Sequence, residues 1–207
     1  MIESRYKEVE LKLHLGREVF DAMLQNQASS SVANRQENFF FDDDKQTLCS
    51  NLLALRMRFS DLGCFLTLKG PANREDGIFS RLEIEEKLET GVANQLKSGF
   101  SLSEVDSEVT KPVLEKLGDL RVSNFLSFKN SRRVFDKDGF TYELDHSTCK
   151  DQELFELEAE CQEKDTDKLK DLTQNWFSQM GWNYETSTEG KFSWAYRISQ
   201  ESSPAKL

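Results

Sequence analysis

Charged side chains recur at every second position in several segments whose other positions are apolar. The first is KEVELKL, in which Glu8, Glu10 and Lys12 alternate with apolar residues. In a β-strand, alternate side chains point to opposite faces, so this segment would have one charged and one apolar face. The same alternation recurs in four further segments. Their charged positions are Arg56 and Arg58; Lys69; Arg81, Glu83 and Glu85; and Glu156, Glu158 and Glu160.

Together these faces are suited to binding a polyanion and a metal ion. Two arginines at i and i+2 of a strand repel each other unless an anion lies between them, and paired glutamates repel each other unless a cation neutralises them. Arginine and lysine bind phosphate oxygens, whereas carboxylates bind Mg²⁺ or Mn²⁺, which can bridge phosphate oxygens. Water activated by a metal or a carboxylate could then attack a terminal phosphorus. A solvent-facing surface explains any single strand, but the joint pattern favours charged faces that point inward.

Composition narrows the class of protein. The 207 residues carry a net charge of −10, with 37% hydrophobic and 31% charged residues. This charge argues against nucleic acid as a partner, because phosphate backbones require a clustered cationic surface. No apolar run of 18 residues and no secretory signal are present, so we expect a cytoplasmic protein with no membrane partner. The four cysteines form no CxxC pair and are expected to be free thiols.

The chain has two histidines, His14 and His146. A histidine-rich metal site or a Ser-His-Asp triad is therefore poorly supported. We expect both histidines to lie off the charged faces and to be structural.

Strand-like segments dominate the chain. We expect strands at residues 5–15, 37–43, 52–60, 63–70, 78–89, 125–135, 140–146 and 153–161. Apolar spacing predicts helices at 17–26 and 165–182, a short helical turn within 44–51, and a helix or strand at 190–199. Eight strands with few helices predict an α+β fold, a closed eight-stranded antiparallel β-barrel with surrounding helices.

Three further details concern the ends and connections of these elements. Asp165 or Thr166 is expected to cap the helix at 165–182, and Gly181 to end it. Residues 71–77 read as a polar loop. Residues 90–120 show helical spacing and no clear strand, which predicts a helical excursion or lid.

The order of the charged motifs resembles that of the CYTH superfamily, also called the triphosphate tunnel metalloenzymes. EVELK resembles the family's ExExK signature, and FFFDDDKQTLCSNLLALRMR resembles its aromatic strand followed by LRxR. The later matches, in chain order, are TLKGP, SRLEIEE, RRVFDKDGFTYELD, FELEAE and EGKF. The resemblance spans residues 6–196. It departs from the family at Asp43, where threonine is usual, and at Asn130, where a basic residue is common.

The resemblance implies one tunnel domain over residues 1–200, including the excursion at 90–120, followed by a flexible tail at 201–207. It also implies the site residues. Substrate phosphates would be bound by Lys12, Arg56, Arg58, Lys69, Arg81, Arg132 and Lys191. Mg²⁺ or Mn²⁺ would be bound by Glu8, Glu10, Glu83, Glu85, Asp145, Glu156 and Glu158. Glu8, Glu10 and Lys12 would be catalytic, with Lys12 helping to position the attacking water.

Strand parity separates two neighbouring glutamates. It favours Glu85 over Glu86 as the inward residue. Beside the family motif, we expect Arg132 to face inward and Arg133 to be solvated. Glu160 would lie at the tunnel mouth or in solvent.

The implied reaction is metal-dependent hydrolysis of the terminal phosphate of a linear triphosphate, with inorganic tripolyphosphate as the expected substrate. Three alternatives stay open: a class IV adenylyl cyclase, a thiamine or nucleoside triphosphatase, and a non-catalytic polyphosphate-binding module. Ala54 beside the LRMR arginines offers no stacking surface for a base or thiamine, and the many carboxylates argue against simple binding of a polyanion. The expected partner is a small-molecule triphosphate, and the protein would be a monomer or homodimer.

Overall fold

The structure is a computed structural model that describes the backbone of residues 2–201 and the side chains of residues 7–201. The strands are β1 (Ile2–Leu15), β2 (Asn34–Asp42), β3 (Ala54–Ser60), β4 (Gly63–Lys69), β5 (Asn73–Glu75), β6 (Ile78–Leu88), β7 (Gly99–Ser101), β8 (Arg121–Lys137), β9 (Phe140–Cys149), β10 (Gln152–Glu160) and β11 (Tyr184–Thr186). The α-helices are α1 (Arg17–Asn26), α2 (Thr47–Ser50), α3 (Thr90–Leu96), α4 (Lys111–Leu117), α5 (Thr166–Met180) and α6 (Lys191–Glu201). Two short 3₁₀ helices are η1 (Leu102–Glu104) and η2 (Glu163–Asp165).

Within the described residues, eight strands pair in the order β1-β10-β9-β8-β2-β3-β4-β6, and β6 pairs in turn with β1. This closes the sheet and confirms the predicted eight-stranded antiparallel barrel with surrounding helices. Three short strands extend the sheet, with β11 on β1, β5 on β6 and β7 on β8.

The chain forms two compact units. The first contains residues up to Lys7, together with 36–72 and 81–129, and the second contains 8–35, 73–80 and the residues from Asn130 onward. The single domain over residues 1–200 stays a prediction. The expected tail at 201–207 lies outside the described residues, apart from Glu201, at which α6 ends.

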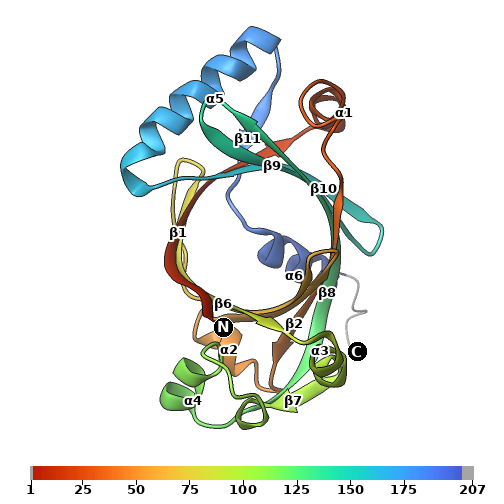
Figure 1. Cartoon of the computed structure of the whole chain (residues 1–207), viewed down its shortest axis with the longest axis vertical. Coiled ribbons are helices and arrows are strands. Elements are labelled where there is room, and N and C mark those ends of the chain that lie inside the picture. Colours follow the sequence, from red (N-terminus) through yellow and green to blue (C-terminus); the bar gives the residue numbers. More distant parts are fainter. Residues whose placement is uncertain (1, 202–207) are drawn as a thin grey trace. The chain divides into compact units, whose positions relative to one another are not determined.

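In the first unit, segment 90–120 covers the apolar face of β2, β3, β4 and β6. The core includes Phe41, Met57 and Leu66 from the strands, packed with Phe100 and Val113 from the segment. Figure 1 shows α3, β7 and α4 of this segment at the lower end of the drawing. The segment therefore lies on the face opposite the charged residues. It also contains the strand β7, which the prediction missed because three residues are too few to show an alternating pattern.

One buried hydrogen bond fastens this segment to β6. The Ser107 hydroxyl, 3% exposed, donates to Glu86 Oε2 at 2.6 Å. Replacing Ser107 with alanine is expected to lower the free energy of unfolding by about 1–3 kcal/mol, because the half-buried carboxylate loses its shorter hydrogen bond and keeps only the one from the Glu108 backbone N–H at 3.2 Å. Urea titration measures this loss. The matched control is Ser103→Ala, which removes an exposed hydroxyl bonded to Asp119 and should change stability by within about 0.5 kcal/mol. Equal losses in the two variants would contradict the anchoring role.

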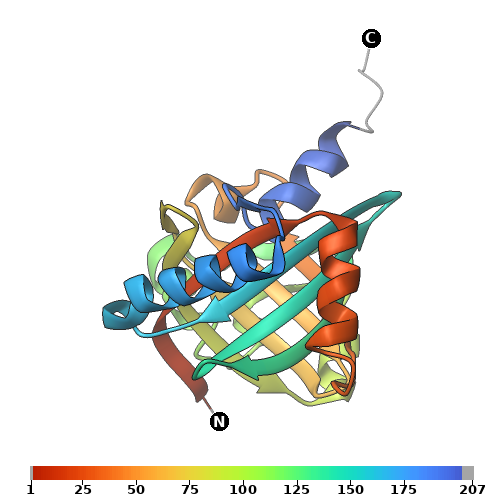
Figure 2. The same ribbon diagram turned by 90° about the horizontal axis from the view of Figure 1, so that it is seen from above.

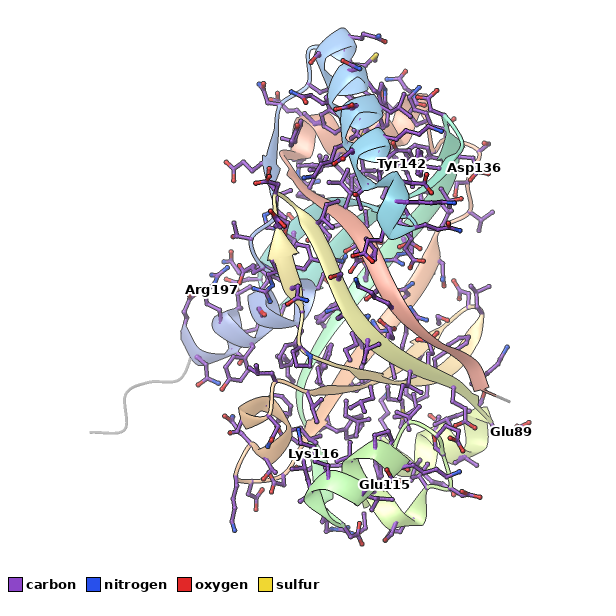
Figure 3. All side chains as sticks on the ribbon, turned by 90° about the vertical axis from the view of Figure 1, so that its left-hand side faces the viewer. Glu89, Glu115, Lys116, Asp136, Tyr142 and Arg197 are labelled. Atoms are coloured by element: carbon purple, nitrogen blue, oxygen red, sulfur yellow. The ribbon has the colours of Figure 1, made fainter. Side chains whose placement is uncertain are left out.

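In the second unit, α1 and α5 cover the apolar faces of β1, β9 and β10. Leu11 and Leu13 of β1 pack with Leu157 of β10, Tyr142 of β9 and Trp176 of α5. Figure 2 shows α5 running across the strands of this unit, and Figure 3 shows Tyr142 beneath that helix. This packing uses one parity of each strand. The charged parity therefore points to the opposite side of the sheet.

Several element predictions need correction or completion. Residues 73–75 form β5 rather than part of a loop, because a hairpin turn with positive φ at Asp76 and Gly77 returns the chain against β6. Strand β11 was not predicted, and the segment at 190–199 is the helix α6. Asp165 precedes α5 without a side-chain capping bond, whereas Gly181 ends the helix in the left-handed conformation, as predicted. Every helix within residues 2–201 is too short or too polar to cross a lipid bilayer.

Candidate active site

The charged face of β1 is buried, not solvent-exposed. Glu8, Glu10 and Lys12 are 7%, 3% and 4% exposed, although the opposite face of the strand holds the apolar core. Burying ionised side chains without partners would cost several kcal/mol each. Such a face therefore requires compensating charges from neighbouring strands.

Strands β9 and β10 supply these charges in register. Lys12 lies opposite Glu158 across the β1–β10 pair, and on β9 Glu143 and Asp145 lie opposite Glu158 and Glu156. Directly opposed residues share one face of the sheet. With Glu10, Arg132 of β8 and Lys191 of α6, they form what we call the acidic cluster, in which carboxylates outnumber basic side chains.

Each basic residue of the acidic cluster contacts two or more carboxylates. Lys12 Nζ lies 2.9 Å from Glu10 and forms an ion pair with Glu158. Arg132 donates to Asp145 from two nitrogens, at 2.8 and 2.6 Å, and also reaches Glu158 at 2.8 Å.

Lys191 Nζ lies within 3 Å of three carboxylates. Its distances are 2.8 Å to Asp145, 2.9 Å to Glu156 and 2.6 Å to Glu158.

These contacts set the protonation states. Burial by itself would lower the pKa of Lys12, but Glu10 and Glu158 outweigh it and the pKa is raised. The pKa of Lys191 is raised well above its ordinary value in the same way, by Asp145 and its neighbours. Burial would raise the pKa of Glu158, but Lys12 and Lys191 hold it well below its ordinary value. Lys12 is therefore an ammonium ion at neutral pH and cannot accept a proton there.

Two residues of this region were missed by the prediction. Glu143 forms an ion pair with Arg132, and burial raises its pKa despite that partner. Asn130 is 4% exposed, accepts a hydrogen bond from Ser147 and donates to Asp145 at 2.9 Å. Glu143 could have been found from parity, because it alternates with Tyr142 on the same strand as Asp145.

The expectation that His14 lies off the charged face is wrong. It continues the row of Glu8, Glu10 and Lys12, and its Nε2 lies 3.3 Å from Glu156 and 2.9 Å from Ser187 Oγ. His146, on the opposite face of β9 from Asp145, lies 2.8 Å from Glu153.

A second group of charges, the basic cluster, occupies the first unit. Arg56, Thr67 and Glu85 lie opposite one another across β3, β4 and β6. Thr67 donates to Glu85 at 2.8 Å, and Glu85 also accepts from Arg58 at 3.1 Å. Burial opposes ionisation of Glu85, but Arg58 and Arg56 lower its pKa. Arg56 Nε is buried and has no hydrogen-bond acceptor among the described residues, so a donor is available to an anion.

The remaining basic residues of the first unit flank this row. Lys69 of β4 forms an ion pair with Glu83 of β6, which is 4% exposed. Arg81 is half-buried, two residues before Glu83 on the same strand and therefore on the same face. Glu86 points to the opposite face, where it binds Ser107.

The other charged positions have defined surroundings. Asp42 and Asp43 bind the start of α2, with Asp42 accepting from the backbone of Leu48 and Asp43 from Thr47. Arg133 was expected in solvent, but it is half-buried and donates to the backbone oxygen of Ser31. Glu160 is exposed. The four cysteines are free thiols, as predicted.

The acidic cluster fits a divalent cation by the chemistry of its donors. Mg²⁺ and Mn²⁺ prefer carboxylate oxygens, which this cluster supplies in excess. Both carboxylate oxygens of Glu156 are buried and accept no hydrogen bond from a described residue. Within the described part of the chain, no three acidic, histidine or cysteine side chains are arranged as a ready metal site, because Lys191, Lys12 and Arg132 lie among the carboxylates.

Comparison with known proteins agrees with this geometry. The HpAC1 protein from Hippeastrum, an adenylyl cyclase candidate reported to have a dominant triphosphatase activity, is 26% identical with a TM-score of 0.84, over 93% of this chain and 96% of its own. A protein from Bacillus halodurans, described as an adenylate cyclase candidate, is 21% identical with a TM-score of 0.70, over 90% and 97%. PH1819 from Pyrococcus horikoshii is 19% identical with a TM-score of 0.56, over 94% and 99%. Similarity to the last two proteins, at 21% and 19% identity, shows only that they share the fold of this chain.

A search of curated protein sequences found no match. The family profile of the CYTH domain matches residues 6–190. This chain therefore belongs to the CYTH family.

Proposed function

We propose that this protein hydrolyses the terminal phosphate of a linear triphosphate with the help of Mg²⁺ or Mn²⁺, and that inorganic tripolyphosphate is its preferred substrate. One observation carries the proposal: acidic and basic side chains are buried together on the same strand faces. In most proteins a strand face is either apolar and buried or charged and exposed to solvent. The dominant triphosphatase activity of HpAC1 supports the hydrolytic reaction.

In this proposal the basic residues hold the phosphates. Those of the basic cluster and its flanks are Arg56, Arg58, Lys69 and Arg81, and those of the acidic cluster are Lys12, Arg132 and Lys191. The orphaned Nε of Arg56 supports an anionic ligand at the basic cluster. Arginine can bind two phosphate oxygens at once, whereas lysine acts as a point charge.

The carboxylates divide into two sets. Glu8, Glu10, Glu156 and Glu158 are the main metal-binding residues in the proposal, and a bound metal would neutralise phosphate charge and acidify a water ligand. Glu83, Glu85 and Asp145 complete the proposed set of metal ligands. Their contacts with Lys69, Arg58 and Arg132 support the additional role of orienting these cations toward phosphate.

Catalysis is assigned to Glu8, Glu10 and Lys12. Because the pKa of Lys12 is raised, its ammonium group orients the attacking water and stabilises charge but does not take the water's proton. In the proposal a carboxylate accepts that proton. Glu10, 2.9 Å from Lys12, is the nearest candidate on the same strand.

The alternatives with an organic substrate require an accessible surface for the base or thiamine. Phe40 lies opposite Arg56 on the same face and stacks on Phe128, with ring centroids 5.8 Å apart. These side chains are only 3% and 6% exposed, which leaves little ring surface for a ligand. This favours the inorganic substrate over the adenylyl cyclase and thiamine triphosphatase alternatives. Location in the cytoplasm and a monomeric or homodimeric state remain predictions.

A substrate panel tests the proposal. Phosphate release from tripolyphosphate, thiamine triphosphate and ATP would be followed with Mg²⁺ and with Mn²⁺, and the ATP reaction would also be assayed for cyclic AMP. We expect kcat/KM for tripolyphosphate to exceed that for ATP by about tenfold or more, because a nucleoside without a complementary surface hinders seating of the triphosphate and returns no binding energy. Formation of cyclic AMP would favour the cyclase. Tight binding of tripolyphosphate without turnover would leave a binding module.

A further inference from the structure

Lys191 occupies a special position among the basic residues of the acidic cluster. It is the first residue of α6, and its single Nζ lies 2.6 to 2.9 Å from oxygens of Asp145, Glu156 and Glu158. Arg132 also reaches three carboxylates, but it does so through several nitrogens spread along a planar group. Only a point charge surrounded by oxygen ligands resembles the surroundings of a bound divalent cation.

The three carboxylates come from two adjacent strands and are held in place. Glu156 lies directly opposite Asp145 across the β9–β10 pair, and Glu158 follows Glu156 on the same face. Asp145, fully buried, is fixed by Asn130 and Arg132. The oxygen ligands would therefore remain close together if Lys191 moved away.

Glu156 depends on a cation more than its neighbours do. It is 0% exposed, and neither carboxylate oxygen accepts a hydrogen bond from a described residue. Its near neighbours of basic type are Lys191 Nζ at 2.9 Å and His14 Nε2 at 3.3 Å. A buried carboxylate without directed hydrogen bonds is stabilised by charge alone, which either an ammonium group or a metal ion can supply.

The side chain of Lys191 can withdraw without unfolding the helix. It belongs to the first residue of α6, so a change of side-chain rotamer leaves the backbone hydrogen bonds of the helix intact. Its four-carbon stem allows the ammonium group to turn toward a phosphate instead. Loss of the proton offers no alternative route, since the pKa of Lys191 is raised well above its ordinary value.

We propose that Lys191 competes with the metal ion: in the metal-free protein its ammonium group occupies the position among Asp145, Glu156 and Glu158 that a divalent cation takes, and metal binding displaces it toward the substrate phosphates. This inference rests on the proposed function. It adds that metal and triphosphate bind cooperatively, because the metal releases a cation that the triphosphate then uses.

The test measures Mn²⁺ binding in the absence of any triphosphate, from the electron paramagnetic resonance signal of free Mn²⁺. We expect Lys191→Met to bind Mn²⁺ about tenfold more tightly than the wild type, because three carboxylates lose a competing charge within 3 Å. The matched control is Arg197→Met on the same helix, which removes an exposed cation paired with Glu189. This control should leave the Mn²⁺ affinity unchanged.

Circular dichroism establishes that each variant is folded. Should Lys191→Met fail to fold, Lys191→Gln removes the charge while retaining a hydrogen-bond donor, and the same gain in affinity is expected. Unchanged or weaker Mn²⁺ binding in the folded variant would overturn the inference, as would absence of binding in both variant and wild type. The substrate panel decides the proposed function separately: tighter Mn²⁺ binding without triphosphate hydrolysis would uphold the competition and reject the reaction.

Discussion

Replacing Lys12 with methionine is expected to lower kcat/KM for tripolyphosphate by about a hundredfold or more, the usual effect of removing one group that stabilises transition-state charge. Lys12 is 4% exposed, remains protonated because its pKa is raised, and lies between Glu10 and Glu158. Methionine fills a similar volume without the charge. Steady-state kinetics over a range of substrate and metal concentrations measures the loss.

The matched control is Lys7→Met, which removes the exposed lysine of the same strand and should leave kcat/KM within about twofold of the wild type. Lys12→Arg restores the charge but not the shape of the ammonium group, and should recover part of the activity. Full activity in Lys12→Met, with the fold intact, would remove Lys12 from the catalytic assignment and leave it a purely structural ion pair.

The alternation of charged and apolar residues explains why so much of the fold could be predicted. On β1, β9 and β10 one parity packs beneath α1 and α5, and the other carries charges. A period of two fixes which residues share a face, whatever the strand eventually pairs with. The same rule places Glu85 with Arg58 and Glu86 with Ser107.

Parity fails where a strand is too short to show it. β5, β7 and β11 have three residues each, and their pairing depends on hydrogen bonds offered by β6, β8 and β1. Segment 90–120 gave a helical signal but no indication of the face that it covers. Only packing of residues such as Val113 against the strand core shows that it lies away from the charges.

The partners of each charge could not be predicted either. Lys191 and Asp145 are far apart in sequence, and nothing in their spacing indicates a contact of 2.8 Å. The family resemblance implied that both belong to the site, but not that they bind each other. His14 was misplaced for a simpler reason: it has the same parity as Lys12, and the row of charges on β1 should have been extended by one position.

A large loss of stability is expected from Arg132→Met. Its guanidinium group binds Asp145, Glu158 and Glu143, and the first two have pKa values below the ordinary range, partly through this contact. Removing one partner from a buried ionic network leaves uncompensated charge. We expect the free energy of unfolding at pH 7 to fall by about 3–5 kcal/mol, measured by urea titration.

The sign of the pH dependence distinguishes this cause from lost packing. A carboxylate whose pKa is lower in the folded state stabilises the protein above its unfolded pKa and loses that contribution as the pH falls toward its folded pKa. Arg132→Met raises the folded pKa values of Asp145 and Glu158, so the difference between variant and wild type should be full at pH 7 and shrink as the pH falls below about 4, the ordinary carboxylate pKa, toward the lowered values of the wild type. Arg133→Met is the matched control, because Arg133 donates to a neutral backbone oxygen of Ser31 and its removal should cost a smaller amount that does not vary with pH. A loss in Arg132→Met that is equally independent of pH would show that Arg132 contributes through packing and not through its charge.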